Sequence, residues 1–181
     1  MKTRTVLLWA IALFVIDQVV KIIINRYFID VRFDIIPPLF YFRPKFNHNY
    51  SYVNELFSFG MGFWTHLILR CFVAILLVII YDLFKTISNN AKIINIAFIF
   101  AFASLSCSLV DTIFWGGSLD FIYLKPLFIF DLKDLYSNVF IILFLCYFFK
   151  NRKYFKTIKN KDIILHYKNW FSSIQNQIIS R

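Results

Sequence analysis

The sequence predicts an all-α polytopic membrane protein with four transmembrane helices and a small, β-containing extracytoplasmic loop region between the first and second helices. The 181 residues are 60% hydrophobic and include 24 Phe and 10 Tyr but only 4 Gly, a composition too apolar for an ordinary soluble domain. Four apolar segments approach the roughly 20 residues that a helix needs to cross a bilayer core. These predicted spans are Thr5–Ile24, His66–Phe84, Ile93–Phe114 and Leu135–Phe149.

The first segment could also be a secretory signal, because basic residues precede an apolar run and the sequence AIA (residues 10–12) resembles a small-residue cleavage site. The apolar run before residue 10 is, however, shorter than the roughly 7–15 residues that such a signal uses. We therefore expect an uncleaved first span.

The loop from Asn25 to Thr65 is long for a connection without a role of its own. Aromatic, alternating stretches at Phe33–Phe42 and Tyr50–Phe59, broken by prolines, indicate short strands that lie on the membrane surface. We expect these strands to form the β-containing part of the fold.

The distribution of Lys and Arg predicts that both termini are cytoplasmic. Basic residues precede the first span, occupy the short link between the second and third spans, and follow the fourth, as the positive-inside rule requires. The loop after the first span is also basic, but its Lys and Arg are mixed with acidic residues. An even number of spans agrees with two cytoplasmic ends.

We expect two parts in the chain: a four-span domain at residues 1–149 and a basic, amphipathic cytoplasmic tail at residues 150–181. The formal net charge is +10, and the tail carries much of this excess. A basic tail beside a span more often lies on anionic lipid than on nucleic acid. Membrane lipids, and no nucleic acid, are therefore its expected partners.

Charged residues inside the spans are candidates for function, because a charge within a membrane is costly. In the first span, Asp17 and Lys21 are four residues apart and lie on one helical face. They could form an internal ion pair that reduces the cost of both charges. Alternatively, Lys21 extends to the membrane interface and leaves Asp17 to hold a neighbouring loop or helix terminus.

Four further aspartates, Asp111, Asp120, Asp131 and Asp134, lie near the end of the third span and the start of the fourth. Asp131 as N-cap and Asp134 in the first turn would satisfy free N–H groups of the fourth helix, but capping does not explain Asp120. Two carboxylates at a partly dry site cannot both ionise cheaply, so one keeps a proton and the pair can act as acid and base on water. This is the chemistry of aspartic peptide hydrolysis.

Four motifs, in order, resemble those of the lipoprotein signal peptidases, the four-span type II signal peptidases of bacteria. DQVVK (residues 17–21) resembles the family's DQxxK, and IPPLFYFRPKFN (residues 36–47) ends at the position of its asparagine, Asn47. LVDTIFWGGSLDF (residues 109–121) resembles the segment in which one Asp precedes the catalytic Asp of a VxDF motif by nine residues. FDLKD (residues 130–134) resembles FNxAD. The resemblance extends from about residue 5 to residue 149.

The resemblance implies a membrane aspartic endopeptidase that removes the signal peptide from prolipoproteins carrying a diacylglyceryl-cysteine. Asp120 and Asp134 would be its catalytic carboxylates. Substrate binding or support of the site would involve Asp17, Lys21, Asn47, Ser108, Asp111 and Asp131. The resemblance implies no metal or other cofactor, and the three cysteines show no CxxC spacing. We expect a monomer in the bacterial cytoplasmic (inner) membrane, with the prolipoprotein and membrane lipids as partners.

Several positions depart from the family's pattern. The family's GAAF after the asparagine is absent, and its GNxxDR reads CSLVDT (residues 107–112), so that Ser108 and Thr112 replace an Asn and an Arg. Asp131 and Lys133 stand where the family has Asn and Ala. The alternative is therefore a catalytically inactive relative that binds lipidated peptides or acts as a membrane scaffold. A third class, an ion-coupled transporter, is disfavoured because the acids crowd one end of the spans.

Overall fold

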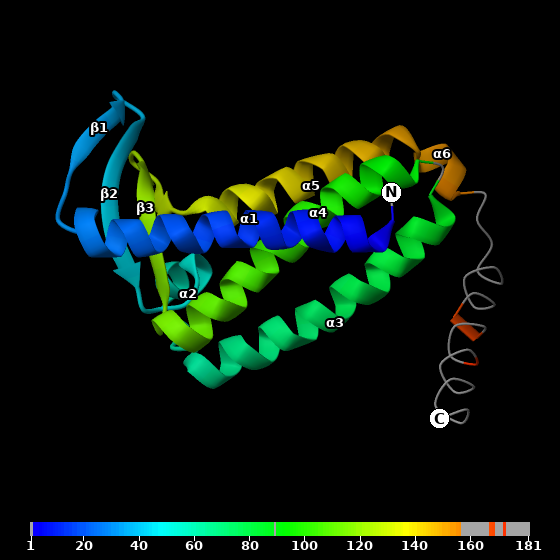
Figure 1. Cartoon of the computed structure of the whole chain (residues 1–181), viewed down its shortest axis with the longest axis horizontal. Coiled ribbons are helices and arrows are strands. Elements are labelled where there is room, and N and C mark those ends of the chain that lie inside the picture. The colour runs from blue at the N-terminus through cyan, green and yellow to red at the C-terminus, as the bar shows by residue number, and fades with distance from the viewer. Residues whose placement is uncertain (1, 89, 157–166, 169–171, 173–181) are drawn as a thin grey trace. The chain divides into compact units, whose positions relative to one another are not determined.

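The computed structural model describes residues 2–88, 90–156, 167, 168 and 172 (Figure 1). Four of its helices are long and apolar enough to cross a membrane, at Thr3–Phe28, Phe63–Ile87, Ala91–Trp115 and Leu132–Lys150. A helix is thus confirmed at each of the four predicted segments, and each helix extends beyond its predicted segment at both ends.

The first and third of these helices each end in a π-helical turn. The first comprises α1 (Thr3–Ile23) and η1 (Ile24–Phe28), and the third comprises α4 (Ala91–Val110) and η2 (Asp111–Trp115). The second is α3 (Phe63–Ile87) and the fourth is α5 (Leu132–Lys150). Two short helices, α2 (Tyr52–Phe57) and α6 (Arg152–Phe155), complete the helices of the described residues.

The helices expose apolar side chains outward and pack through small residues. Trp9, Phe72 and Ile142 are each more than half exposed, which suits a surface covered by lipid tails and not by water. Buried alanines lie between the helices, including Ala10 on α1 and Ala103 on α4. Small residues let two backbones approach closely, and this packing brings the polar end of α1 against the end of α4.

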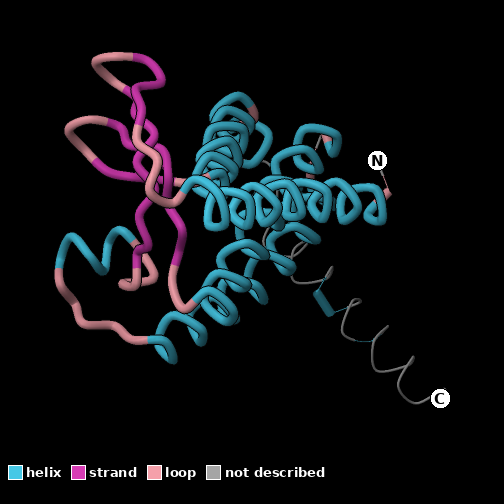
Figure 2. Tube along the Cα trace, turned by 60° about the vertical axis from the view of Figure 1, so that its left-hand side comes forward, coloured by secondary structure: helices cyan, strands magenta, loops and turns pink. Residues whose placement is uncertain are grey.

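A four-stranded antiparallel sheet and α2 lie at one end of α1, α3 and α4 (Figures 1 and 2). The strands, in sheet order, are β1 (Phe33–Ile36), β2 (Phe40–Asn47), β3 (Ser118–Leu124) and β4 (Phe128–Phe130). A buried cluster of Ile24, Phe42, Leu119 and Phe121 fixes the sheet to the end of the first span. This contact positions β3, which carries Asp120.

The structure corrects the predicted position of the β-structure in two ways. Half of the sheet, β3 and β4, comes from the segment between the third and fourth spans, where no strand was predicted. Gly116 has a φ of +62°, a conformation that glycine adopts easily, and ends η2 so that the following segment can pair with β2. The stretch Tyr50–Phe59, predicted as strand, instead contains α2, whose N-terminus is capped by the Ser51 hydroxyl.

Contacts divide the chain into two compact units, residues 1–143 and residues 144–181. In the second unit the rings of Phe148 and Phe155 stack with their centroids 5.4 Å apart. Most of the predicted amphipathic tail at residues 150–181 lies outside the described residues, so the tail remains a prediction.

Candidate active site

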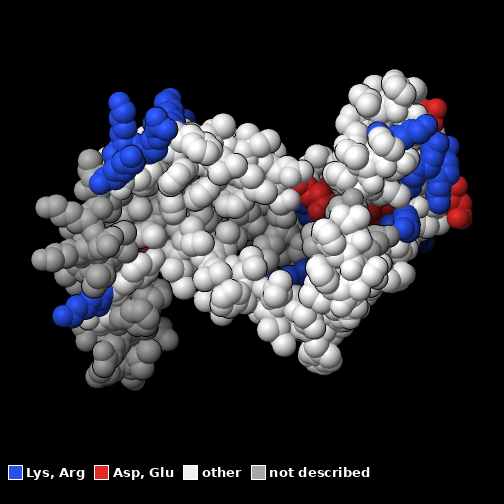
Figure 3. Space-filling model, turned by 180° about the vertical axis from the view of Figure 1, so that it is seen from behind, with Lys and Arg blue, Asp and Glu red and all other residues white. Residues whose placement is uncertain are grey.

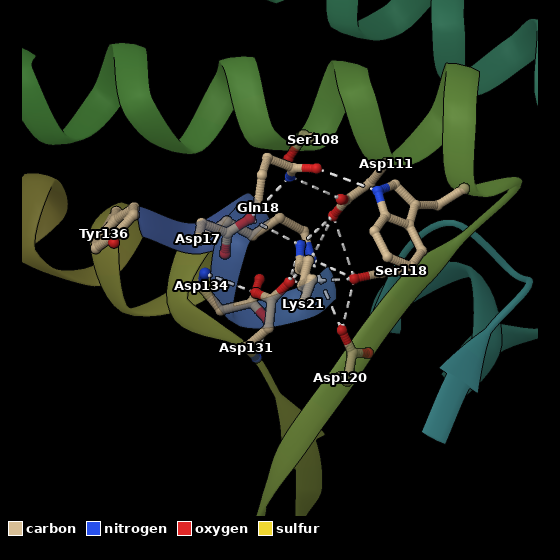
Figure 4. Close-up of polar contacts among 12 residues, drawn as sticks. Asp17, Gln18, Lys21, Ser108, Asp111, Ser118, Asp120, Asp131, Asp134 and Tyr136 are labelled. Atoms are coloured by element: carbon tan, nitrogen blue, oxygen red, sulfur yellow. Dashed lines mark hydrogen bonds and ion pairs between the residues drawn. The ribbon is translucent and has the colours of Figure 1, made fainter. Parts of the chain in front are cut away.

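Seven charged side chains from four elements meet at the end of the helices that carries the sheet (Figure 4). They are Asp17 and Lys21 on α1, Asp111 in η2, Asp120 on β3, and Asp131, Lys133 and Asp134 at the start of α5. Six are buried, and Asp134 is partly exposed. Such a cluster is stable only if each charge finds a partner, so the contacts between these groups define the site.

Lys21 joins three carboxylates at the centre of the cluster (Figure 4). Its ammonium nitrogen lies 3.0 Å from Asp17, 2.7 Å from Asp111 and 2.7 Å from Asp131. The predicted ion pair with Asp17 is confirmed. The alternative, in which Lys21 extends to the membrane interface, is wrong because the side chain is fully buried.

Asp17 has a second neighbour that positions it. The Gln18 amide donates a hydrogen bond to Asp17 at 3.0 Å and accepts one from the Trp115 indole N–H at 3.1 Å. This chain of contacts connects α1 to η2. Oδ1 of Asp17 has no hydrogen-bond partner among the described residues.

Asp131 and Asp134 form a reciprocal cap at the start of α5. The backbone N–H of Asp134 donates to Oδ1 of Asp131, and the backbone N–H of Asp131 donates to Oδ2 of Asp134, both at 3.2 Å. This is the capping-box arrangement, here with an aspartate at the third helical position. The predicted capping role is therefore confirmed for both residues. It leaves the second oxygen of Asp134 available for other contacts.

Ser118 connects Lys133 to Asp120. Its hydroxyl donates to Oδ1 of Asp120 at 2.6 Å and accepts a hydrogen bond from the Lys133 ammonium group. Lys133 also contacts Asp131 and lies 3.7 Å from Oδ1 of Asp120. Because a serine hydroxyl has one proton, the shortest of its acceptor distances identifies Asp120 as its acceptor.

The surroundings of Asp120 and Asp131 shift the pKa values of the two carboxyl groups in opposite directions. Burial raises the pKa of Asp120 from 3.8 to about 6, an effect that the attraction of Lys133 offsets only in part. Burial also acts on Asp131, but the ammonium groups of Lys133 and Lys21 touch its carboxylate and hold its pKa well below the usual range. Asp131 therefore stays ionised near neutral pH, whereas Asp120 gains or loses its proton close to that pH.

Asp120 and Asp134 face a common cavity. Carboxylate oxygens of Asp120, Asp131 and Asp134 lie within 4.8 Å of one another. The cavity beside them has a volume of about 300 Å³, and its wall includes Asp120, Asp134, Lys133 and Ser118. Figure 3 shows acidic and basic atoms inside a hollow between the helices and the sheet. The arrangement can hold a water molecule between two carboxyl groups.

The same three carboxylates are a poor site for a metal ion. Oδ2 of Asp131 already contacts the ammonium groups of Lys21 and Lys133, and Oδ1 accepts the backbone N–H of Asp134. Two cations at this position would repel a third. The two lysines of the cluster thus already occupy the positions beside Asp131 that a metal ion would need.

The remaining predicted residues, Asn47 and Ser108, also line the cavity. Oδ1 of Asn47 accepts the backbone N–H of Asn49 at 3.0 Å, so its amide nitrogen is left for other partners of the site. Added to Gly117, a Cβ atom would lie 2.6 Å from the carbonyl oxygen of Asn47, so glycine allows β2 and the start of β3 to approach here. The structure thus brings every predicted site residue to the cluster or its cavity.

Ser118, Lys133 and Arg70 are site residues that the sequence analysis did not select. Ser118 lies two residues before Asp120 on a strand, and the alternation of a strand places both on one face. Arg70 is a charged residue inside a span, which is itself a signal of function. It lines the cavity from α3.

Comparisons with known proteins agree with this geometry. Residues 9–150 match the family described as signal peptidase (SPase) II. A solved structure of a bacterial membrane enzyme, obtained by the in meso method at 2.3 Å resolution, superposes with a TM-score of 0.63 and 20% identity over 87% of this chain and 94% of that chain. A second, at 1.9 Å resolution, gives a TM-score of 0.63 and 21% identity over 80% and 92% of the two chains. None of the curated proteins matches. At these identities the solved structures establish the fold alone.

Proposed function

Because the chain belongs to the signal peptidase II family, we propose that it is a membrane aspartic endopeptidase that removes the signal peptide from prolipoproteins with a diacylglyceryl-modified cysteine. One observation carries the proposal: carboxylate oxygens of Asp120 and Asp134 lie within 4.8 Å of each other beside a cavity. The pair lies at one end of four helices that are long and apolar enough to cross a membrane. A cleavage site at the end of an apolar signal peptide would reach this position.

In the proposed reaction, Asp120 is ionised and Asp134 is protonated when the substrate binds. Asp120 takes a proton from water while the water oxygen bonds to the carbonyl carbon of the residue before the modified cysteine, and Asp134 gives its proton to the carbonyl oxygen. The resulting gem-diol collapses when Asp120 gives its proton to the amide nitrogen and Asp134 takes one from a hydroxyl group. The C–N bond then breaks, which releases a carboxylic acid and the amine of the cysteine.

Ser118 and Lys133 support this division of roles. A donated hydrogen bond favours the charged form of a carboxyl group, and Asp120 receives one from Ser118 at 2.6 Å with the Lys133 ammonium behind it. Lys133 thus acts as a positioning residue: it donates a hydrogen bond to the Ser118 hydroxyl, which in turn donates one to Asp120. Lys21 acts further away, because it holds Asp131 and with it the start of α5.

The loop at residues 49–61, which we call the loop over the cavity, would contact the bound substrate. Tyr50 and Ser51 line the cavity, and Asn47 offers an amide group to the peptide backbone of the substrate. The enzyme would act as a monomer without a cofactor, as a multi-pass protein of the bacterial inner membrane. Both termini would be cytoplasmic, which places Asp120 and Asp134 toward the outer face.

The proposal is tested with the purified full-length protein in detergent micelles and two forms of one prolipoprotein. One form carries the diacylglyceryl group on its cysteine, and the other has the unmodified thiol. We expect cleavage of the lipid-modified form alone, with mass spectrometry showing the modified cysteine as the new N-terminus. No cleavage of the modified form, or a cut elsewhere in the chain, would contradict the proposed function.

A further inference from the structure

Arg70, on α3, lines the cavity, and one nitrogen of its guanidinium group lacks a hydrogen-bond partner among the described residues. Its Nη2 donates a hydrogen bond to the backbone carbonyl oxygen of Tyr50 at 2.7 Å, which fixes the plane of the group. Its Nη1 is buried and has no hydrogen-bond partner among the described residues. A buried donor without an acceptor costs free energy, and the cost is larger when the group is charged. A ligand that supplies an acceptor would remove this cost and therefore bind more tightly.

Arg70 stands at the boundary between two different spaces. The first is the polar cavity that Asp120 and Asp134 line. The second is an apolar groove of about 290 Å³ between α3, α4 and α5, lined by Val73, Leu77, Leu105 and Phe140 among others. Arg70, Ser108 and Ser137 belong to the walls of both, so the groove continues from the cavity. A ligand at Arg70 can therefore be polar at one end and apolar at the other.

The charges around the cavity decide which acceptor fits. A phosphate or carboxylate group at Arg70 would share the cavity with Asp120 and Asp134, and like charges within one cavity repel each other. A neutral carbonyl oxygen accepts the hydrogen bond without this repulsion. An ester carbonyl also carries an acyl chain, and the apolar groove begins at the same arginine.

We propose that Nη1 of Arg70 binds an ester carbonyl oxygen of the diacylglyceryl group, with the attached acyl chain in the groove between α3, α4 and α5. This inference rests on the proposed function, because it assigns the recognition of that substrate's lipid. Arg70 contacts the lipid and not the reacting bond, so it determines which lipid group is accepted. An ether-linked chain has the same length and apolar surface but lacks the carbonyl oxygen.

The test compares the binding of two ligands to the full-length protein in micelles: a peptide beginning with S-diacylglyceryl-cysteine and its dialkyl ether analogue. Neither contains a scissile bond, so dissociation constants are measured without activity. We expect the parent protein to bind the diester about 10–100-fold more tightly than the diether, the range for one hydrogen bond to a charged group. Arg70→Met should bind both ligands with the affinity that the parent has for the diether.

Arg32→Met is the matched control, because Arg32 is exposed and donates to the backbone of its own turn. This variant should keep the preference for the diester. Equal affinity of the parent for diester and diether would overturn the inference, as would an equal loss for both ligands in Arg70→Met. Cleavage is measured separately with the diacylglyceryl prolipoprotein. A protein that prefers the diester but cleaves nothing would keep the lipid site and refute the proposed peptidase activity.

Discussion

The ammonium nitrogen of Lys21 lies 2.7 Å from a carboxylate oxygen of Asp131, and both side chains are fully buried. This ion pair joins the first helix to the residue that caps the last span, two elements that are far apart in the sequence. The same Asp131 oxygen also contacts Lys133, which begins the path through Ser118 to Asp120. The candidate catalytic pair is therefore supported by a charge network anchored in α1.

Replacing Lys21 with methionine should destabilise the protein strongly. Asp17, Asp111 and Asp131 would lose the cation that all three contact, and a buried charge without its partner costs about 3–5 kcal/mol. Thermal unfolding in detergent measures the effect. Lys92→Met, at an exposed position on α4, is the control and should unfold near the parent's temperature. Equal unfolding temperatures for the two variants would show that the network contributes nothing to stability.

Ser118→Ala should shift the pH dependence of cleavage. Without the donated hydrogen bond, the charged form of Asp120 is less favoured, so its pKa rises further above about 6. The acidic limb of kcat/KM should move to higher pH by about one unit. Ser106→Ala is the control, because Ser106 is exposed on α4 and does not line the cavity. An acidic limb that stays in place in Ser118→Ala would refute the role of Ser118.

Asp120 should lower stability at neutral pH, as functional groups often do. Its pKa in the folded protein is raised to about 6, above 3.8 for the unfolded chain, so the folded state binds the proton more tightly. Stability from this group is therefore present below pH 3.8 and is lost as the pH rises to about 6, by up to about 3 kcal/mol. Asp120→Asn should unfold at a higher temperature than the parent at pH 8, and the difference should shrink toward pH 4. A difference that does not change with pH would contradict this reasoning.

Asn54→Ala should loosen the loop over the cavity. The Asn54 amide nitrogen donates to the carbonyl oxygens of Asn49 and Met61, and its oxygen accepts the N–H of Met61, at 2.8–3.1 Å. Each lost hydrogen bond costs about 1 kcal/mol. Limited proteolysis should therefore cut residues 49–61 faster than in the parent. The control is Asn49→Ala, an exposed side chain in the same loop, and equal cutting of the two variants would contradict the predicted role.

The helical part of the fold could be predicted from the sequence because its signal is local. Each span is a long apolar run, and the ion pair of Asp17 with Lys21 follows from their spacing on one helix. The strands β3 and β4 could not be recognised in this way. Ser118–Leu124 is a strand because it pairs with Phe40–Asn47, and two spans separate the two strands in the chain.

Most members of the candidate site were predicted, but Ser118, Lys133 and Arg70 were not, and neither were the contacts between the site residues. The resemblance of the motifs to those of the lipoprotein signal peptidases selected Asp120 and Asp134, and capping preferences selected the place of Asp131. The pairing of Lys21 with Asp131 depends on how α1 packs, which no local pattern contains. The role of Ser118 follows from strand alternation only once β3 is known to be a strand.

The most direct test of the central claim is single-turnover cleavage of a diacylglyceryl-modified prolipoprotein by the parent, Asp120→Asn, Asp134→Asn and Asp30→Asn. Asp30 is exposed and outside the charge network, so its variant controls for the loss of one carboxylate. We predict that the parent and Asp30→Asn cleave the substrate, whereas Asp120→Asn and Asp134→Asn bind it without cleavage. Cleavage by either of those two variants at the parent's rate would contradict the assignment of Asp120 and Asp134 as the catalytic pair.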